Sequence, residues 1–455
     1  MEPSSIFRAH GNGEGFVWLD SSLESGPYAN WSFIMNEPSF LIKGGGGSFV
    51  FTGADGKKTA IDGNPLGFIE KILARYKTEK SPSVKYPPFT GGMAGFFGYG
   101  LTRYTEPSAR INWDRDFAPE GDLWLGCYLR LIAFDHARKK TFLVVNHAHD
   151  ESPEPALEEL ERLMGPSQAY GAGAPVSVEN PLDIAPVKEF TREEYIESVE
   201  KIREYIADGD CYQVNLSQAF ESAMGADAKT IYEKLRVLSP APFASYLDCG
   251  RFQILSSSPE RFVSVRDGSA QTRPIKGTRP RGATEEEDQR MRGNLSASQK
   301  DRAENVMIVD LMRNDLSKVC EPFSVTVPEI CAVEEYATVY HLTSTVEGRI
   351  KEGVGPIGVL NAVFPPGSVT GAPKTRALEI IDELEPTPRG AYCGAIGYVG
   401  FDGDMDLSVA IRIMVCSGRQ ARFHAGGGVT YSSSAVKEYE ETLHKAKAIM
   451  EALNR

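Results

Sequence analysis

Four carboxylates occur as two pairs with the spacing of a helix face. Asp301 and Glu304 are three residues apart, and so are Glu438 and Glu441. Residues at this spacing lie on the same side of an α-helix. Solvated surface charges have the same pattern, but two such pairs facing each other would repel unless a hard cation lay between them. Mg²⁺ suits one or two carboxylates, several waters and an anionic ligand. The pairs therefore indicate either surface charge or a magnesium site.

A short basic segment interrupts an otherwise acidic chain. Within TRPIKGTRPRG, four cationic residues lie within nine positions: Arg273, Lys276, Arg279 and Arg281. A basic stripe on the surface would read the same way. The functional alternative is a lysine, Lys276, held beside a carboxylate such as Glu260 and activated as a nucleophile or base.

Two glycine-rich segments could receive an anion. FPPGSVTGAPKTRA resembles a phosphate loop, but its spacing differs from GxxxxGK[ST] and Pro373 lacks the amide that a phosphate cradle needs. Nucleotide binding is therefore not expected, although a helix start there could accept a carboxylate. In HAGGGVTYSSS, Gly426, Gly427 and Gly428 follow an apparent strand. They form either a turn or a place where backbone amides approach an anion closely.

One histidine, His341, lies in the strand-like run VYHLTSTVEG, where it is either a buried structural residue or part of a site. No GxSxG, HExxH or GxGxxG motif is present, and no Cys/His nucleophile arrangement is visible.

The elements that would position these residues are mixed in type. Residues 1–160 are rich in short strands, with a hairpin expected across the glycines 44–47. Helices are expected from the N-cap Thr191 to Gly209, with Glu194 completing a capping box, over 298–312, from Pro373 onward, and over 436–453. CYQVNLSQAF is an alternating strand. Because strands and helices do not alternate regularly, the patterns favour an α+β fold.

Composition limits the organisation and the partners. The Gly-, Pro-, Ala- and Ser-rich segment 165–181 is expected to be a linker or surface crossover, which divides the chain into regions 1–165 and 182–455. With 41% hydrophobic and 24% charged residues the 455-residue chain is globular. A net charge of -13 argues against nucleic acid or an anionic membrane as the main partner. No membrane span or signal peptide is expected. Seven scattered cysteines indicate reduced thiols and a cytoplasmic protein.

Taken together, the motifs resemble the chorismate-utilising enzymes, the family of anthranilate synthase component I, aminodeoxychorismate synthase component I and the isochorismate and salicylate synthases. The matching stretches run in the family's order: PFTGGMAGFFGYG, GDCYQVNLSQAF, SSSPERF, TRPIKGTRPRG, DRAENVMIVDLMRND, HLTSTVEG, FPPGSVTGAPKTRALEIIDELEP, RGAYCGAIGYVG, VAIRIMV and AGGGVTYSSSAVKEYEETLHKA. The resemblance implies an anthranilate-synthase-like, chorismate-binding α+β fold, in which two antiparallel sheets pack face to face with helices outside.

The resemblance also implies roles for the residues. Glu304 and Glu441 match the family's Mg²⁺ ligands, and Asp301 and Glu438 match carboxylates that hold metal-bound waters; the family usually has Glu at the position of Asp301. His341 matches a histidine near the C1 carboxylate of the ring. The residues that match substrate contacts are Gly277, Thr278, Thr370, Tyr392, Arg412, Gly426, Gly428 and Lys445.

Two positions favour one branch of the family. Anthranilate synthases resemble PIAGT where this chain has PIKGT, and the enzymes that aminate C4 carry this lysine, Lys276, as a nucleophile. Water-using members carry a lysine base where this chain has Gln213. The implied reaction is attack of Lys276 on C2 of chorismate with loss of the C4 hydroxyl. Ammonia then attacks C4, Glu260 handles the protons, and 4-amino-4-deoxychorismate is formed for p-aminobenzoate and folate synthesis.

The resemblance also suggests partners and alternatives. No cysteine elbow of a glutaminase is present, so ammonia is expected from solution or from a separate glutamine amidotransferase subunit, and pyruvate elimination from a separate lyase. Similar proteins hold tryptophan in an N-terminal pocket, as feedback inhibitor or structural ligand, and WLDSSLESGPYANWSF is the candidate segment here. The alternatives are an anthranilate synthase component I and a catalytically silent regulatory paralogue, against which the intact set of site residues argues.

Overall fold

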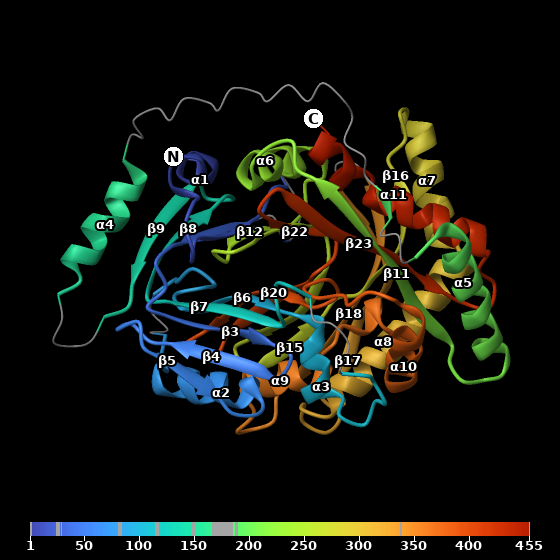
Figure 1. The fold of residues 1–455 in the computed structure, drawn as a ribbon, viewed down its shortest axis with the longest axis horizontal. Helices are drawn as coiled ribbons and strands as arrows, with labels where there is room; N and C mark the ends of the chain where they lie inside the picture. Colours follow the sequence, from blue (N-terminus) through green and yellow to red (C-terminus); the bar gives the residue numbers. More distant parts are fainter. Residues whose placement is uncertain are drawn as a thin grey trace.

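The computed structural model describes residues 2–23, 28, 30–80, 84–113, 118–147, 152–165, 185–186, 190–336 and 339–454. Two large antiparallel sheets pack face to face, and helices cover their outer faces (Figure 1). In Figure 1, α1, α6 and α11 lie above the upper sheet, and α2, α3 and α9 lie below the lower one. The predicted arrangement of two packed antiparallel sheets with helices outside is therefore what the structure has.

The upper sheet contains strands from the whole chain. Its order is β10 (Ala185–Pro186), β11 (Gln213–Ala223), β23 (Gln420–Val429), β22 (Ile413–Ser417), β13 (Gln253–Ser258), β12 (Phe243–Asp248), β1 (Val17–Asp20), β2 (Trp31–Met35), β8 (Arg130–Asp135) and β9 (Lys140–Val145), with β19 (Gly371–Ala372) pairing with β11.

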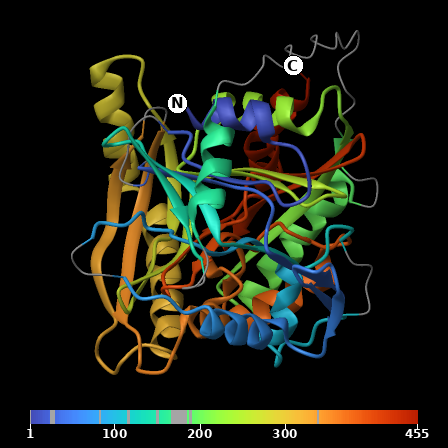
Figure 2. The same cartoon turned by 90° about the vertical axis from the view of Figure 1, so that its left-hand side faces the viewer.

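The lower sheet is built in the same way. Its order is β16 (Ile275–Pro280), β18 (Val339–Arg349), β15 (Ser269–Thr272), β14 (Arg261–Arg266), β21 (Met405–Val409), β20 (Ala395–Gly400), β6 (Gly92–Phe97), β7 (Leu123–Tyr128), β3 (Phe40–Gly45), β4 (Ser48–Thr52) and β5 (Lys58–Ile61), with β17 (Thr326–Glu335) pairing with β18. The long orange strands β17 and β18 form one side of the molecule (Figure 2). Strands of regions 1–165 and 182–455 are neighbours in both sheets, through β1 with β12 and β6 with β20.

The helices are α1 (Pro3–His10), α2 (Pro65–Arg75), α3 (Thr102–Thr105), α4 (Glu154–Met164), α5 (Arg192–Ala207), α6 (Ala228–Leu238), α7 (Glu285–Ala297), α8 (Gln299–Ser317), α9 (Pro356–Val363), α10 (Lys374–Leu384) and α11 (Ala435–Asn454), with single 3-10 turns at Tyr99–Leu101 and Gly367–Val369. No described helix is long and apolar enough to cross a membrane.

Two apolar layers hold these elements together. The larger core lies between the sheets, where Phe33 and Ile254 from the upper sheet meet Trp124 and Leu407 from the lower one. A second core packs the outer face of the upper sheet against α1, α6 and α11, around Trp18 and Tyr232. Burying large aromatic side chains in this way supplies most of the favourable free energy of folding.

Local signals in the sequence are largely confirmed. β3 and β4 form the expected hairpin, whose turn contains Gly46 and Gly47 with φ of 63° and 82°. The Thr191 side chain and Glu194 form both hydrogen bonds of the expected capping box at the start of α5. The helices near 373 and 436 are also present, as α10 and α11.

Three expectations need correction. Gly426–Gly428 do not form a turn; they lie within β23 and pair with Ser217, Leu216 and Asn215 of β11. The helix expected over 298–312 continues to Ser317. Residues 1–160 were predicted to be rich in short strands, but helices α1 to α3 and the start of α4 also lie there. The segment 166–184, expected to be a linker, lies outside the described residues.

Candidate active site

A cavity of about 800 Å³ gathers the residues that the sequence singled out. Its lining residues come from β16 and β18, from α8 and α11, which carry the acidic pairs, and from β23, whose residues form its floor. Figure 1 shows where these elements lie in the fold. Of the predicted site residues, the ones that line it are Glu260, Lys276, Gly277, Thr278, Asp301, Glu304, His341, Tyr392, Arg412, Gly426, Gly428, Glu438, Glu441 and Lys445. Thr370 does not line the cavity; it is fully buried beneath it, and its hydroxyl donates to the Pro366 carbonyl at 2.8 Å.

Lys276 projects from β16 at a β-bulge, where the pairing with β18 shifts between Lys276 and Thr278. A bulge redirects a side chain out of the regular alternation of the strand. Its ammonium donates to the Ser368 carbonyl at 3.0 Å. Burial lowers the pKa of Lys276 below the ordinary lysine value, although Glu304 and Glu260 favour the charged form. The site therefore favours a neutral amine, the form in which lysine is a nucleophile.

Glu260 lies between β13 and β14 and is 5% exposed. Burial raises the pKa of its carboxyl above the usual range, against a hydrogen bond from the Ser368 side chain and the charge of Lys276. A carboxyl group with a raised pKa can hold a proton near neutral pH and deliver it to a leaving oxygen. Ser368 contacts both groups, so one residue holds the amine and the acid in the same place.

His341 is a buried neutral imidazole. Burial, and then the charge of Arg412, lower its pKa to about 4. Its Nδ1 lies 2.9 Å from the Thr278 hydroxyl, and its ring packs edge-on against Tyr336 at 5.3 Å between centroids. We assign Nδ1 as the acceptor of the Thr278 proton, so that Nε2 carries the proton of the ring. The imidazole can then donate a hydrogen bond without adding charge.

Arg412 precedes β22 with a φ of 51°, a conformation that costs a side-chain-bearing residue about 1–2 kcal/mol. Burial lowers the pKa of its guanidinium. No hydrogen bond or ion pair of the Arg412 side chain occurs with any described residue. A strained, buried, unpaired cation in a cavity is suited to an anionic ligand such as a carboxylate.

The acidic pairs of α8 and α11 face the same cavity. Burial raises the pKa values of Glu304 and Glu438. Burial also opposes ionisation of Glu441, but Lys445, whose ammonium lies 2.7 Å away, and other nearby cations hold its pKa below the usual range. Asp301 is paired with Arg279 at 2.7 Å.

Whether these carboxylates fit a magnesium ion can be tested on their contacts. The Glu304 Oε1 atom is buried and has no hydrogen-bond partner among the described residues. A Cβ added to Gly427 would meet Glu438 Oε2 at 3.1 Å and Glu441 Oε1 at 3.5 Å, so these two oxygens converge over this glycine. No group of three or more His, Cys, Asp or Glu side chains in the described part of the chain has the spacing of a complete metal site. Among the described residues, the Glu304 Oε1 atom forms only a long ion pair, with Lys300 at 3.8 Å. A carboxylate oxygen without a hydrogen bond, in a cavity where two other carboxylate oxygens converge, fits a hard cation that keeps most of its waters.

A buried ion pair beneath the cavity fixes its floor. Arg389 donates to both oxygens of Glu385 at 2.7 and 2.8 Å, and both side chains are almost completely buried. The same guanidinium donates to the carbonyls of Val369 at 3.0 Å and of Asn215 at 2.8 Å. Glu385 also accepts from the amide and hydroxyl of Ser217. The pair therefore joins β11 to the segment around Val369. In that segment the Ser368 carbonyl accepts the hydrogen bond from Lys276.

Sequence reasoning missed several residues of this site. Ser368 contributes through its backbone carbonyl, and Glu385 and Arg389 act from below the cavity. Asn215 lines the cavity although no role was assigned to it within CYQVNLSQ. His424 also lines it and stacks on Tyr392, with ring centroids 5.2 Å apart and an interplanar angle of 13°. The only signal in the sequence was the position of these residues inside the matching motifs.

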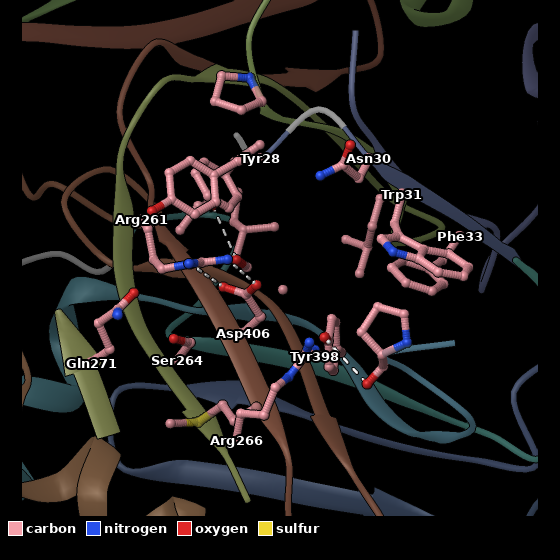
Figure 3. Close-up of a pocket in the computed structure, with 18 of the residues that line it drawn as sticks. Tyr28, Asn30, Trp31, Phe33, Arg261, Ser264, Arg266, Gln271, Tyr398 and Asp406 are labelled. Atoms are coloured by element: carbon pink, nitrogen blue, oxygen red, sulfur yellow. Dashed lines mark hydrogen bonds and ion pairs between the residues drawn. The ribbon is translucent and has the colours of Figure 1, made fainter. Parts of the chain in front are cut away.

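A second cavity, of about 440 Å³, lies beside the N-terminal strands. Figure 3 shows Trp31 and Phe33 on one side of it and Tyr28 with Arg261 on the other. Arg261 is paired with Asp406, and its guanidinium lies over the Tyr28 ring at 4.3 Å. Glu260 and Arg261 are consecutive, yet Glu260 faces the first cavity and Arg261 the second.

Comparison with known proteins gives a consistent result. Residues 37–451 match the profile of a protein family described as chorismate binding enzyme. Aminodeoxychorismate synthase component 1 of Klebsiella aerogenes is 41% identical over 391 residues, which cover 86% of this chain and 83% of the relative. Anthranilate synthase component 1 of Acetivibrio thermocellus is 32% identical over 465 residues, covering 99% and 92%.

A solved structure shares the fold. The crystal structure of anthranilate synthase component I from Streptococcus pneumoniae has a TM-score of 0.79 and 35% identity to this chain, covering 94% of this chain and 93% of that one. The predicted anthranilate-synthase-like α+β fold is thereby confirmed.

Proposed function

The chain belongs to the chorismate-binding enzyme family, and we propose that it aminates chorismate at C4 to give 4-amino-4-deoxychorismate. The observation that carries the proposal is Lys276: its amine lies in the cavity, hydrogen-bonded to the Ser368 carbonyl, with a pKa lowered by burial. Relatives named aminodeoxychorismate synthase component 1 support this activity, and relatives named anthranilate synthase component 1 show that the family also contains the alternative.

The residues that line the first cavity would bind chorismate by its two carboxylates. Arg412 and Lys445 supply positive charge, and the neutral imidazole of His341 donates a hydrogen bond beside the Thr278 hydroxyl. Tyr392, Gly277, Gly426 and Gly428 complete the wall, where small residues let the backbone approach the ligand. Thr370 acts from below the cavity, by supporting β11.

Two displacements follow at the ring. The neutral Lys276 amine forms a bond to C2, the double bonds shift, and the C4–O bond breaks as the Glu260 carboxyl gives its proton to the leaving hydroxyl, which departs as water. Ammonia then forms a bond to C4, the double bonds shift back, and the C2–Nζ bond breaks to release neutral Lys276. Glu260 takes the surplus proton from the new amine. A raised pKa for Glu260 and a lowered pKa for Lys276 favour the starting forms that this sequence of steps needs.

We further propose that Mg²⁺ is the cofactor. Glu304 and Glu441 would hold it directly, and Asp301 and Glu438 would hold its waters. The ion would neutralise a substrate carboxylate and act on it as a Lewis acid.

We propose that ammonia reaches the site from a separate glutamine amidotransferase subunit; the name "component 1" of the relatives supports a partner. We also propose a cytoplasmic location, supported by seven cysteines that are all free in the structure.

For the second cavity we propose tryptophan as the ligand. Its volume, its aromatic side chains Trp31 and Phe33 and the Arg261–Asp406 pair suit a small aromatic amino acid. Saturable binding of tryptophan in calorimetry, weakened in Trp31→Ala, would support this, and absence of binding to the wild type would contradict it.

The test of the activity is product identification. The purified chain is incubated with chorismate, Mg²⁺ and ammonium at mildly alkaline pH, with and without an aminodeoxychorismate lyase, and the products are identified by mass spectrometry. We expect a product that becomes p-aminobenzoate only when the lyase is present, and we expect Lys276→Ala to abolish it. Anthranilate formed without the lyase would assign the chain to the alternative. No turnover at all would favour a regulatory role.

A further inference from the structure

The cavity floor contains a buried amide that lacks a partner. Asn215 of β11 lines the cavity and is 5% exposed, and its Oδ1 atom makes no hydrogen bond with any described residue. Gln213, two residues earlier on the same face of the strand, is completely buried with both ends of its amide unpartnered. An unpaired buried polar group costs about 1–3 kcal/mol. Such groups beside a cavity indicate a small polar ligand that would satisfy them.

Asn215 is held rigidly on both sides of its peptide. Its N–H donates to the Thr370 carbonyl at 2.8 Å, and its carbonyl accepts from Arg389 at 2.8 Å. These two backbone hydrogen bonds fix the position of Asn215, although its amide oxygen makes no hydrogen bond with a described residue.

One short loop accepts hydrogen bonds from both the nucleophile and the backbone of Asn215. Lys276 donates to the Ser368 carbonyl, and Asn215 donates to the Thr370 carbonyl, two residues further along. Two residues span at most about 7 Å of chain. The hydrogen bonds of Lys276 and Asn215 therefore both end on the three-residue segment 368–370.

The strand opposite leaves room for a ligand. Asn215 is the cross-strand partner of Gly428, which has no side chain on the cavity side. A Cβ at Gly428 would meet the Gln213 amide nitrogen at 2.6 Å, so the glycine also lets Gln213 lie beneath the floor. A larger residue at 428 would collide with the Gln213 amide.

The chemistry of the amide decides what fits there. The unpartnered atom is an acceptor, so its partner must be a donor. The carboxylates of chorismate have no donor, and Arg412 and Lys445 serve them elsewhere in the cavity. The C4 hydroxyl of chorismate is a donor, but in the proposed mechanism this group faces Glu260 and leaves as water before ammonia attacks. An amide also has no basic group, so it cannot activate water, whereas ammonia is a nucleophile without prior deprotonation. The small donor that matches both properties is ammonia.

We propose that Asn215 is the ammonia-binding residue of this site and orients the nitrogen for attack by accepting a hydrogen bond through Oδ1. The inference rests on the proposed amination and names the residue that receives its second substrate. The lone pair of the bound ammonia forms the bond to C4 while the C2–Nζ bond breaks, and Glu260 accepts the surplus proton. Asn215 gains and loses no proton in this step.

The test separates the two substrates. Initial rates are measured with varied ammonium at saturating chorismate, and with varied chorismate at saturating ammonium, for wild type, Asn215→Ala and Asn215→Asp. Ser222→Ala is the matched control, because Ser222 is a buried polar residue on the same strand but lies outside the cavity. Loss of one hydrogen bond predicts an apparent KM for ammonium about three- to tenfold higher in Asn215→Ala. The KM for chorismate should stay within about twofold, and Asn215→Asp, which keeps an acceptor oxygen of the same shape, should restore ammonium binding.

A second readout keeps the test valid for slow variants. Without ammonium, intact-protein mass spectrometry should show Lys276 carrying chorismate less one water in both wild type and Asn215→Ala, because the first displacement does not need Asn215. An unchanged KM for ammonium in Asn215→Ala, or an equal rise in both KM values, would overturn the assignment. Loss of the covalent adduct in Asn215→Ala would also overturn it. If the wild type makes anthranilate, the proposed regiochemistry fails, but the effect on the KM for ammonium still decides the role of Asn215.

Discussion

Neither partner of the buried Glu385–Arg389 pair should be removable alone without a large loss of stability, and replacing one partner tests this. Arg389→Met removes four hydrogen bonds, two to Glu385 and one each to the carbonyls of Val369 and Asn215. It also removes the guanidinium that neutralises the Glu385 carboxylate, which is 4% exposed. Removing one partner of a buried pair costs about 3–5 kcal/mol. Since a domain is stable by only about 5–15 kcal/mol, a large share of the total is lost.

The second replacement identifies the cause. Glu385→Leu added to Arg389→Met removes the buried carboxylate charge as well, so the double variant should cost no more than the single one despite losing more groups. Lys201→Met is the control, because Lys201 and Glu204 form an exposed pair on α5, and such pairs contribute at most about 1 kcal/mol. Free energies of unfolding come from urea titrations followed by circular dichroism. The reasoning is refuted if Arg389→Met costs no more than Lys201→Met, or if the effects of the two buried replacements simply add.

Three further predictions concern the cavity. Burial lowers the pKa of Lys276, so its neutral fraction should rise with pH through a midpoint below the ordinary lysine value. The rate of covalent adduct formation without ammonium should rise with it until Glu260 loses the proton that the leaving hydroxyl needs; a rate that falls over the whole pH range contradicts this. Arg412→Met should raise the KM for chorismate about 10- to 150-fold, the equivalent of a lost hydrogen bond to a charged group, and a change below about threefold would remove Arg412 from the carboxylate site. Gly426→Ala should destabilise the chain by about 1–3 kcal/mol, because its Cβ would meet the Leu216 carbonyl at 2.5 Å, and Gly427→Ala should cost less, since its nearest contact is the end of the Glu438 side chain at 3.1 Å; equal midpoints in urea would contradict this.

Side-chain chemistry in the sequence identified part of the site as candidates, and the family resemblance supplied the rest of the residues and their roles. The acidic pairs, Lys276, His341 and Arg412 were predicted because their types and motifs carry information, and the structure brings all of them to one cavity. Capping and turn signals were likewise local, so the start of α5 and the hairpin of β3 and β4 could be predicted.

The remaining features depend on contacts between distant segments. The glycines of β23 look like a turn in isolation, and they form a strand because β11 supplies their hydrogen-bond partners. The last turn of α8 contains Asp315, which is buried against Lys374 of α10 at 2.6 Å, a contact that no local pattern reveals. The carbonyls of Ser368 and Thr370 are available to Lys276 and Asn215 only because the loop is folded, and every residue type has such a carbonyl.

Charge explains how an acidic chain can hold a dianion. The net charge of -13 is not repeated in the cavity, where among the described residues six cationic and six anionic side chains form the wall. The cations are Lys276, Arg279, Lys300, Arg412, Lys445 and Lys447, and the anions are Glu260, Asp301, Glu304, Glu438, Glu441 and Glu451. If Lys276 and Glu260 are both neutral, as their pKa shifts favour, the balance is unchanged. A doubly charged anion alone would unbalance such a cavity, and so would a divalent cation alone. Bound together they restore neutrality, so each should increase the affinity for the other by the same factor. The acidic pairs on α8 and α11 are therefore compatible with an anionic substrate, and the proposed cation makes them part of its binding site.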